Sequence, residues 1–134
     1  MLRLRHPRRW HLASGLLLLA VLAIALSPDI LARFLGEGPG TPHLDKWLHG
    51  LTFVLLALWF SGQYARESYG WIVLGLAAYG GIIELGQSMI PYRTAECGDL
   101  AADCAGILAG MMIALAGAGG WGQRLEPWLE RRFG

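Results

Sequence analysis

Long apolar stretches alternate with short polar ones along the chain, and four of them are long enough to cross a bilayer as helices, which takes about 20 residues. These stretches cover about 10–28, 45–65, 70–90 and 98–120. Pro91 ends the third one, because proline cannot continue a helix. The pattern predicts an all-α fold: an integral membrane bundle of four transmembrane helices with short outer loops, forming a single domain over residues 1–134.

The first apolar stretch also has features of a secretory signal peptide. Ala25, Leu26 and Ser27 resemble a small-x-small cleavage site after a short apolar core. Pro28 would then follow the cut, which is unfavourable for cleavage. We therefore expect an uncleaved first helix.

Basic residues are distributed unevenly between the two predicted sides of the membrane. Of the 11 lysines and arginines, eight fall on one side and three on the other. The eight are Arg3, Arg5, Arg8, Arg9, Arg66, Arg124, Arg131 and Arg132, and the three are Arg33, Lys46 and Arg93. An excess of basic residues marks the cytoplasmic side, so both termini are expected to be cytoplasmic.

Composition agrees with a membrane location. The chain is 54% hydrophobic and 16% charged, with a formal net charge of +1. A chain this apolar is typical of a multi-pass protein of the inner (cytoplasmic) membrane, whose first partner is the lipid bilayer. The small net charge argues against nucleic acid as a partner. The composition is compatible with a homo-oligomer.

Glu84 is an acidic residue inside the third predicted span. It precedes Pro91 by seven residues, which at 1.5 Å per residue places it about 10 Å inside the outer boundary. A charged carboxylate that faced lipid there would cost about 2.5–3.5 kcal/mol. Gln87, three residues later, shares the same helix face. Both side chains are therefore expected to face protein or water.

Two further helix ends bring polar groups to the same outer side. Asp45 and His49 are four residues apart and share a face, as do Asp99 and Asp103. A convergent polar site is the simplest explanation. The candidate catalytic residues are Glu84, His49 and Asp99, and the candidate ligand-binding residues are Arg93, Gln87, Lys46, Asp45 and Asp103. Glu84 and His49 could transfer protons as acid and base. Arg93 and Lys46 could hold an anionic head group.

The sequence does not predict a metal site. Asp45, His49, Asp99 and Asp103 could hold a divalent ion, but no compact ligand motif such as paired histidines is present. The cofactor therefore stays unknown. Cys97 and Cys104 would lie about 10 Å apart on one helix, too far for a disulfide.

Small residues recur at every fourth position of the fourth predicted helix, which lets another helix backbone approach closely. They are Ala102, Gly106, Gly110, Ala114 and Ala118. Gly80 and Gly81 on the third helix are the expected partners. The tail after Gly120 is expected to lie at the interface, partly helical and interrupted at Pro127, and no polar lining is expected in the inner half of the bundle. The tryptophans are expected to anchor the helices at the interface.

With these residues in place, the chain resembles the VanZ-like family of small bacterial membrane proteins over about 44–110. The family shows Asp-Lys-x-x-His, Glu-x-x-Gln and Pro-x-Arg elements in this order, followed by acidic or amide positions. The matching residues are Asp45, Lys46, His49, Glu84, Gln87, Pro91, Arg93, Glu96, Asp99 and Gly106. Asp103 departs from the asparagine expected in many members and makes this site more acidic.

The resemblance implies a role in the cell envelope, since the family is named after a protein linked to resistance against the lipoglycopeptide teicoplanin. It does not imply a particular chemistry. We therefore predict a site that binds or modifies an amphiphilic envelope molecule at the outer leaflet. Three alternatives stay open: binding without turnover, a small proton- or ion-coupled transporter centred on Glu84, and a structural network that only pins the helices together.

Overall fold

The structure, a computed structural model, describes residues 2, 4–27, 42–90 and 97–133, with the side chains of 42–45 and 133 excluded. Within these residues all regular elements are helical. They are α1 (Pro7–Ala25), α3 (Pro42–Gln63), the 3-10 turn η1 (Arg66–Ser68), α4 (Tyr69–Ser88), α5 (Cys97–Ile113), the π-helical η2 (Ala114–Ala118) and α6 (Trp121–Phe133). The all-α prediction is thus confirmed, and each predicted span contains a long helix. The predicted outer loops lie outside the described residues.

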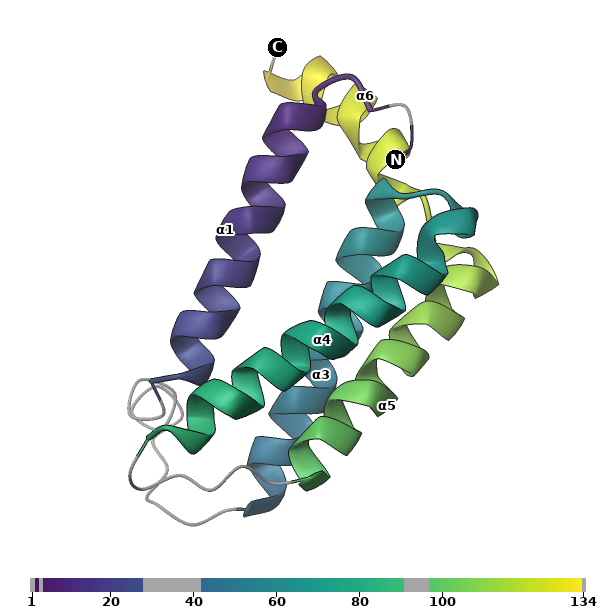
Figure 1. Cartoon of the computed structure of the whole chain (residues 1–134). Coiled ribbons are helices and arrows are strands. Elements are labelled where there is room, and N and C mark those ends of the chain that lie inside the picture. The colour runs from purple at the N-terminus through teal and green to yellow at the C-terminus, as the bar shows by residue number, and fades with distance from the viewer. Residues whose placement is uncertain (1, 3, 28–41, 91–96, 134) are drawn as a thin grey trace.

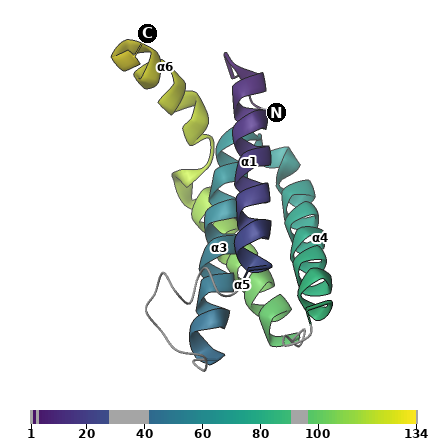
Figure 2. The same cartoon turned by 90° about the vertical axis from the view of Figure 1, so that its left-hand side faces the viewer.

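The helices α3, α4 and α5 run along one another, and α3 and α5 form the most extensive helix pair. In Figure 1, α1 approaches α4 at the end opposite the chain termini and diverges from α4 toward them, where Ser14 of α1 is hydrogen-bonded to Gln63 of α3. The N-terminus and C-terminus lie at the same end, as the topology predicted, and α6 leaves the bundle at an angle there (Figure 2). We call this the terminal end of the bundle, and the other the distal end.

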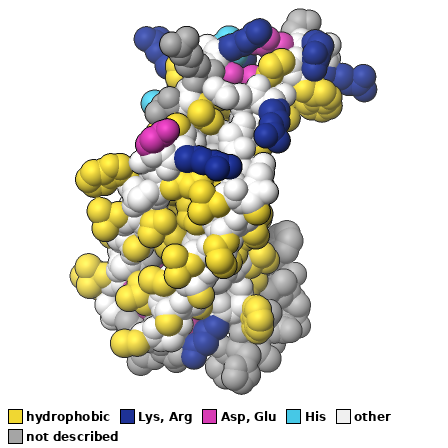
Figure 3. Space-filling view, turned by 90° about the vertical axis from the view of Figure 1, so that its right-hand side faces the viewer, with side chains coloured by type: hydrophobic (Ala, Val, Ile, Leu, Met, Phe, Trp, Pro, Cys, Tyr) yellow, Lys and Arg dark blue, Asp and Glu magenta, His cyan; other side chains and the backbone are white. Residues whose placement is uncertain are grey.

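In the part of the chain that the structure describes, three helical segments are long and apolar enough to cross a membrane: Pro7–Ala25, Arg66–Ser88 and Cys97–Ala118. Hydrophobic side chains cover the middle of the face shown in Figure 3, whereas most of its charged side chains gather at the terminal end. This distribution fits a lipid-embedded middle, because apolar side chains facing solvent would be unfavourable. That α3 forms a fourth span, and that both termini lie on the cytoplasmic side, are predictions from the sequence.

Close contact between α3 and α5 depends on the small residues of α5. A Cβ at Gly106 would overlap the carbonyl oxygen of Gly50, and one at Gly110 would lie 2.8 Å from the carbonyl oxygen of Val54. Gly106 and Gly110 of the predicted stripe therefore form a packing surface against α3, since only glycine lets the two backbones approach this closely. Ala118, at the end of the stripe, is exposed. The expected partner Gly81 was wrong: a Cβ there would meet nothing within 4 Å.

Hydrogen bonds from α4 side chains fix α1 in place. The Tyr79 hydroxyl donates to the Leu18 carbonyl at 2.6 Å, and Gln87 Nε2 donates to the Ala25 carbonyl at 3.0 Å. Near the second bond, the side chain of Leu26 packs against Gly86. Because α1 buries little of its own surface, these two bonds are important for its position.

The connection from α5 to α6 uses two glycines with positive φ. Gly117 has φ of 128° and Gly120 has φ of 70°, conformations that residues with a side chain rarely adopt. The Gly120 amide then donates to the Ser61 carbonyl of α3 at 2.9 Å. The chain thereby turns into α6, which continues through Pro127, so the predicted interruption at this proline was wrong.

At the terminal end, α6 holds the start of the chain through Glu126, whose carboxylate is 6% exposed. Its oxygens accept hydrogen bonds from the Arg5 amide at 2.7 Å, the Trp10 indole at 2.8 Å and the His6 amide at 3.1 Å. Burial alone raises the pKa of Glu126, but these bonds and the nearby His6 ring outweigh it, so that its pKa is below the usual range. Glu126 therefore clasps the N-terminal segment as a charged group.

Substituting Glu126→Gln should lower stability at neutral pH by about 2 kcal/mol, because bonds to a charged acceptor are lost. Since the folded pKa is lowered, the charged group stabilises the fold above its unfolded pKa of about 4.3, and this contribution disappears as the pH falls through the folded value. Melting temperatures of both proteins in detergent should therefore converge under acidic conditions. Glu130→Gln, which removes an exposed ion pair with Arg5, serves as control and should change stability by about 1 kcal/mol at most. A difference between wild type and Glu126→Gln that is independent of pH would contradict this assignment.

Candidate functional site

A cluster of buried ionisable side chains lies in the distal half of the bundle, where α3, α4 and α5 meet. It consists of His49 from α3, Glu84 from α4 and Asp103 from α5. One ligand atom of each residue can be chosen so that all three lie within 4.8 Å of one another. We call these residues the triad. The predicted convergence of three helix ends therefore brings together three of the eight candidate site residues.

His49 and Asp103 are hydrogen-bonded to each other. His49 Nδ1 and Asp103 Oδ1 are 2.9 Å apart, and the side chains are 9% and 0% exposed. An ionised carboxylate can only accept, so with Asp103 ionised Nδ1 carries a proton, and in the neutral imidazole Nε2 then keeps its lone pair. The carboxylate thus orients the imidazole, as in sites where histidine acts as a base or a metal ligand.

The second oxygen of Asp103 has a different environment. Oδ2 is buried and accepts no hydrogen bond from the described part of the chain. On the α4 side it faces Gly80, where a Cβ would lie only 2.8 Å from it. A buried carboxylate oxygen without a donor is costly, and such exceptions often mark functional sites. Gly80 thus leaves the space beside this oxygen unfilled by a side chain.

Glu84 and Asp99 are also buried, at 8% and 6% exposure. Asp99 lies one helical turn before Asp103 on the same face of α5, as the spacing predicted. The end of the Lys46 side chain packs against Gly98, the neighbour of Asp99, since a Cβ at this glycine would lie 3.0 Å from Lys46 Nζ. The ammonium group of Lys46 is therefore placed beside Gly98 at the start of α5.

Three other predicted site residues are not placed in the triad. Gln87 is 1% exposed but donates to α1, so it satisfies a backbone carbonyl at this position. The Asp45 side chain and Arg93 lie outside the described residues. Cys97 and Cys104 are free and exposed, in agreement with their predicted inability to form a disulfide.

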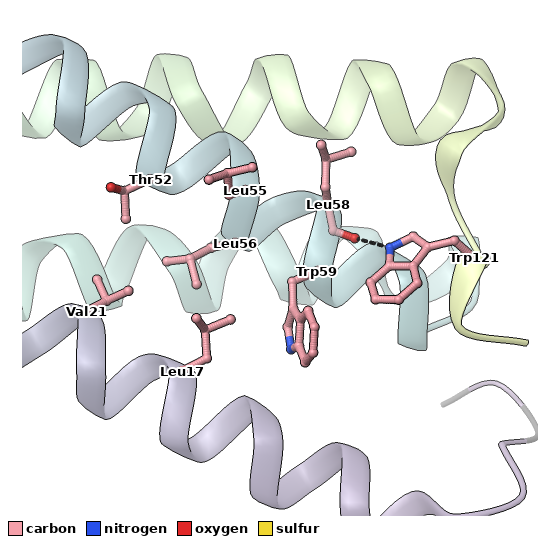
Figure 4. A pocket seen from close by; sticks show the side chains of 8 residues that line it. All are labelled: Leu17, Val21, Thr52, Leu55, Leu56, Leu58, Trp59 and Trp121. Carbon is pink, nitrogen blue, oxygen red and sulfur yellow. Dashed lines mark hydrogen bonds between the residues drawn. The ribbon is translucent and has the colours of Figure 1, made fainter. Parts of the chain in front are cut away.

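An apolar crevice of about 460 Å³ runs between α1 and α3 toward the terminal end. Figure 4 shows its lining side chains on these helices and Trp121. They are Leu17, Val21, Thr52, Leu55, Leu56, Leu58, Trp59 and Trp121. Thr52 is three residues after His49 on α3, about 4.5 Å along the helix axis, so the crevice begins within one turn of the triad residue.

A second polar group, which the sequence analysis missed, lies in the terminal half. Ser14 and Gln63 are buried and hydrogen-bonded at 3.2 Å, and the Trp59 indole donates to Ser14 Oγ at 2.9 Å. The expectation of an inner half without polar lining was therefore wrong. The only signal was one serine and one glutamine within apolar stretches, and neither reveals its partner. Trp59 and Trp121, expected at the interface, pack on Trp10 instead.

Sequence comparisons match most of this chain to a known protein family. The family model described as VanZ/LLP1 matches residues 8–118, from the first turn of α1 to the end of η2. No match was found among curated proteins or among solved structures. The match spans most of the chain and includes every triad residue, and the apolar helices fit a multi-pass membrane protein. The chain therefore belongs to the VanZ/LLP1 family.

Proposed function

We propose that this protein binds an amphiphilic molecule of the cell envelope at the outer leaflet, with its polar head at the triad. The observation that carries the proposal is the burial of His49, Glu84 and Asp103 together between three apolar helices. Ionisable side chains within a membrane are costly and are usually retained for function. Under the predicted topology, the distal end faces the outside.

The head group would meet both basic and acidic groups. Lys46 of α3, whose ammonium group lies beside Gly98 at the start of α5, could pair with a phosphate or carboxylate, and Arg93 is predicted to approach from the adjacent connection. His49, oriented by Asp103, could take a proton from a hydroxyl or amine of the ligand. Glu84 is the candidate acid. This set would permit acid–base chemistry on the bound ligand as well as binding alone.

The crevice supplies a site for the apolar part of such a ligand. Its lining is almost entirely aliphatic and aromatic, and it begins within one helical turn of His49. An acyl chain placed there would leave its head group close to the triad, because both lie along α3. We expect a lipidated glycopeptide of the teicoplanin type to suit this arrangement better than one without an acyl chain, consistent with the resistance that the family resemblance implies.

We expect Glu84→Gln to abolish most of the protection that the protein gives to expressing cells against a lipoglycopeptide. Loss of a charged contact of about 1.5–3 kcal/mol corresponds to at least about tenfold weaker binding. Growth inhibition should be measured beside membrane yield and thermal stability. Arg93→Ala should behave similarly if it holds an anionic group.

Ser88→Ala is the matched control for this experiment, because Ser88 is exposed on the same helix and its hydroxyl donates to the Leu85 carbonyl of that helix. It should retain full protection. A glycopeptide without an acyl chain should show no dependence on any variant. If wild-type cells gain no protection, or Glu84→Gln folds and still protects fully, the proposal is wrong.

The structural alternative has one observation in its favour, the hydrogen bond between His49 and Asp103. In that case Glu84→Gln would reduce yield and stability together with protection. A transporter is less well supported. Between the triad and the Ser14–Gln63 pair lie Phe53, Leu56 and Ala57, each at most 2% exposed, so apolar side chains separate the two polar groups.

A further inference from the structure

We propose that His49, Glu84 and Asp103 form a binding site for one divalent transition-metal ion, with Zn²⁺ as the reference ion. The sequence analysis assigned no metal, and its weighed ligand set drew on Asp45 and Asp99. The structure favours a different set, with one ligand from each of α3, α4 and α5. The inference rests on the proposed function for the role of the ion, but its existence can be tested without any envelope ligand.

The spacing of the three residues is close to that of a coordination sphere. Ligand atoms bonded to one ion at about 2.1 Å lie about 3.0–3.4 Å from each other. In the triad they lie within 4.8 Å. His49 Nδ1 and Asp103 Oδ1 are 2.9 Å apart, and the proton shared between them would be released when both atoms bind the ion. The largest spacing therefore exceeds that of a coordination sphere by at most about 1.4–1.8 Å, a difference that side-chain rotation can close.

Asp103 gives an independent indication of a missing ligand. Its carboxylate is 0% exposed, yet Oδ2 accepts no hydrogen bond from any described residue. A buried oxygen of this kind needs a donor or a cation. Gly80 keeps the adjacent volume clear, since a Cβ would fall 2.8 Å from Oδ2. Lys46, the single lysine of the sequence, has its ammonium group beside Gly98.

The ligand types limit which ion suits the site. One imidazole and two carboxylates make a mixed nitrogen and oxygen set, which fits Zn²⁺, Mn²⁺ or Fe²⁺ better than Ca²⁺ or Mg²⁺, for which all-oxygen sets are usual. Two carboxylates also carry the charge that a dication would neutralise in an apolar surrounding. Three protein ligands would leave a position open for a head-group oxygen, as in zinc sites that bind substrate.

The test uses the full chain without an affinity tag, purified in detergent and stripped with a chelator. Zn²⁺ titration by calorimetry should give one site per chain. Asp103→Asn and Glu84→Gln should each weaken binding by at least about tenfold. Glu130→Gln, which removes a carboxylate beside His6 at the terminal end, is the matched control and should bind as the wild type does.

Co²⁺ provides a second measurement that needs no variant. Its absorption bands should appear and saturate at one equivalent of wild-type protein, and Zn²⁺ should remove them. Absence of these bands, or folded Asp103→Asn and Glu84→Gln proteins that retain full affinity, would overturn the inference. If either variant fails to fold, the wild-type Co²⁺ spectrum decides.

The outcomes also separate this inference from the proposed function. If the protein binds no metal but Glu84→Gln loses lipoglycopeptide protection while folded, the metal site is wrong and the proposed function stands. If Zn²⁺ binds at the triad but folded Glu84→Gln still protects, the metal site stands and the proposed function is wrong.

Discussion

Replacing Gly106 by alanine should separate α3 from α5 and lower the free energy of unfolding by about 2 kcal/mol or more. The added Cβ would overlap the carbonyl oxygen of Gly50 and crowd the Gly50 Cα as well. These are backbone atoms, which cannot rotate away as a flexible side chain can. Because this helix pair is the most extensive in the fold, its separation should also disturb His49 and Asp103, which face each other across it.

Gly75→Ala on α4 is the matched control, because a Cβ there would meet nothing within 4 Å. Alanine favours a helix over glycine by up to about 1 kcal/mol, so this variant should be neutral or slightly more stable. Both proteins should be unfolded with sodium dodecyl sulfate in mixed micelles and followed by circular dichroism. Equal stability of the two variants would show that close contact at Gly106 contributes little.

The positions of the helices were predictable, because the lengths of the apolar stretches and the helix-breaking residues between them determine where each helix begins and ends. The predicted span over about 70–90 corresponds to α4, Tyr69–Ser88, since Pro91 limits how far that helix can continue. The span over about 98–120 is less simple: α5 ends at Ile113, a π-helical turn follows, and Gly117 adopts a positive φ. Glycines within an apolar stretch are compatible with both a straight helix and this turn, so the pattern could not distinguish them.

Helix partners were harder to predict than helices. The small-residue stripe indicated close packing but not its partner, because Gly50 on α3 and Gly80 on α4 are equally small. In the structure both are used, for different purposes: Gly50 lies against Gly106, whereas Gly80 faces the carboxylate of Asp103. Such a division depends on the rotation of each helix about its axis, which apolar periodicity defines weakly when nearly every position is apolar.

The candidate site was predictable as a region and not as a set of contacts. Charge within apolar sequence pointed to His49, Glu84 and Asp103, but Gln87 was predicted to bind a ligand at the same site, whereas its side chain donates to α1. Glu126 was missed because its partners are two backbone amides and an indole from the start of the chain. A charged residue in an arginine-rich tail resembles an ordinary surface residue until the fold brings its donors to it.

Removing the Asp103 carboxylate should have the largest effect of any change within the triad. Asp103→Ala leaves His49 buried without its partner, and breaking a buried pair typically costs about 3–5 kcal/mol. His49→Ala should also destabilise the protein. If the contact is a charge-assisted hydrogen bond, the stability lost in the double variant should be smaller than the sum of the losses in the two single variants. The difference should be about 1.5–3 kcal/mol.

The control pairs Asp103→Ala with Glu126→Gln, because Glu126 is a buried carboxylate on α6, beyond the opposite end of α5. Those two losses should add within about 0.5 kcal/mol. Unfolding free energies of the single and double variants are measured in mixed micelles, with and without added Zn²⁺. They give one double-mutant cycle for His49 and Asp103 and a control cycle for Asp103 and Glu126. Without metal, additive losses at His49 and Asp103 would mean that the 2.9 Å contact contributes no coupling. With Zn²⁺, the coupling should increase, because either substitution removes a ligand of the same ion and thereby most of the stabilisation that metal binding gives to the folded state.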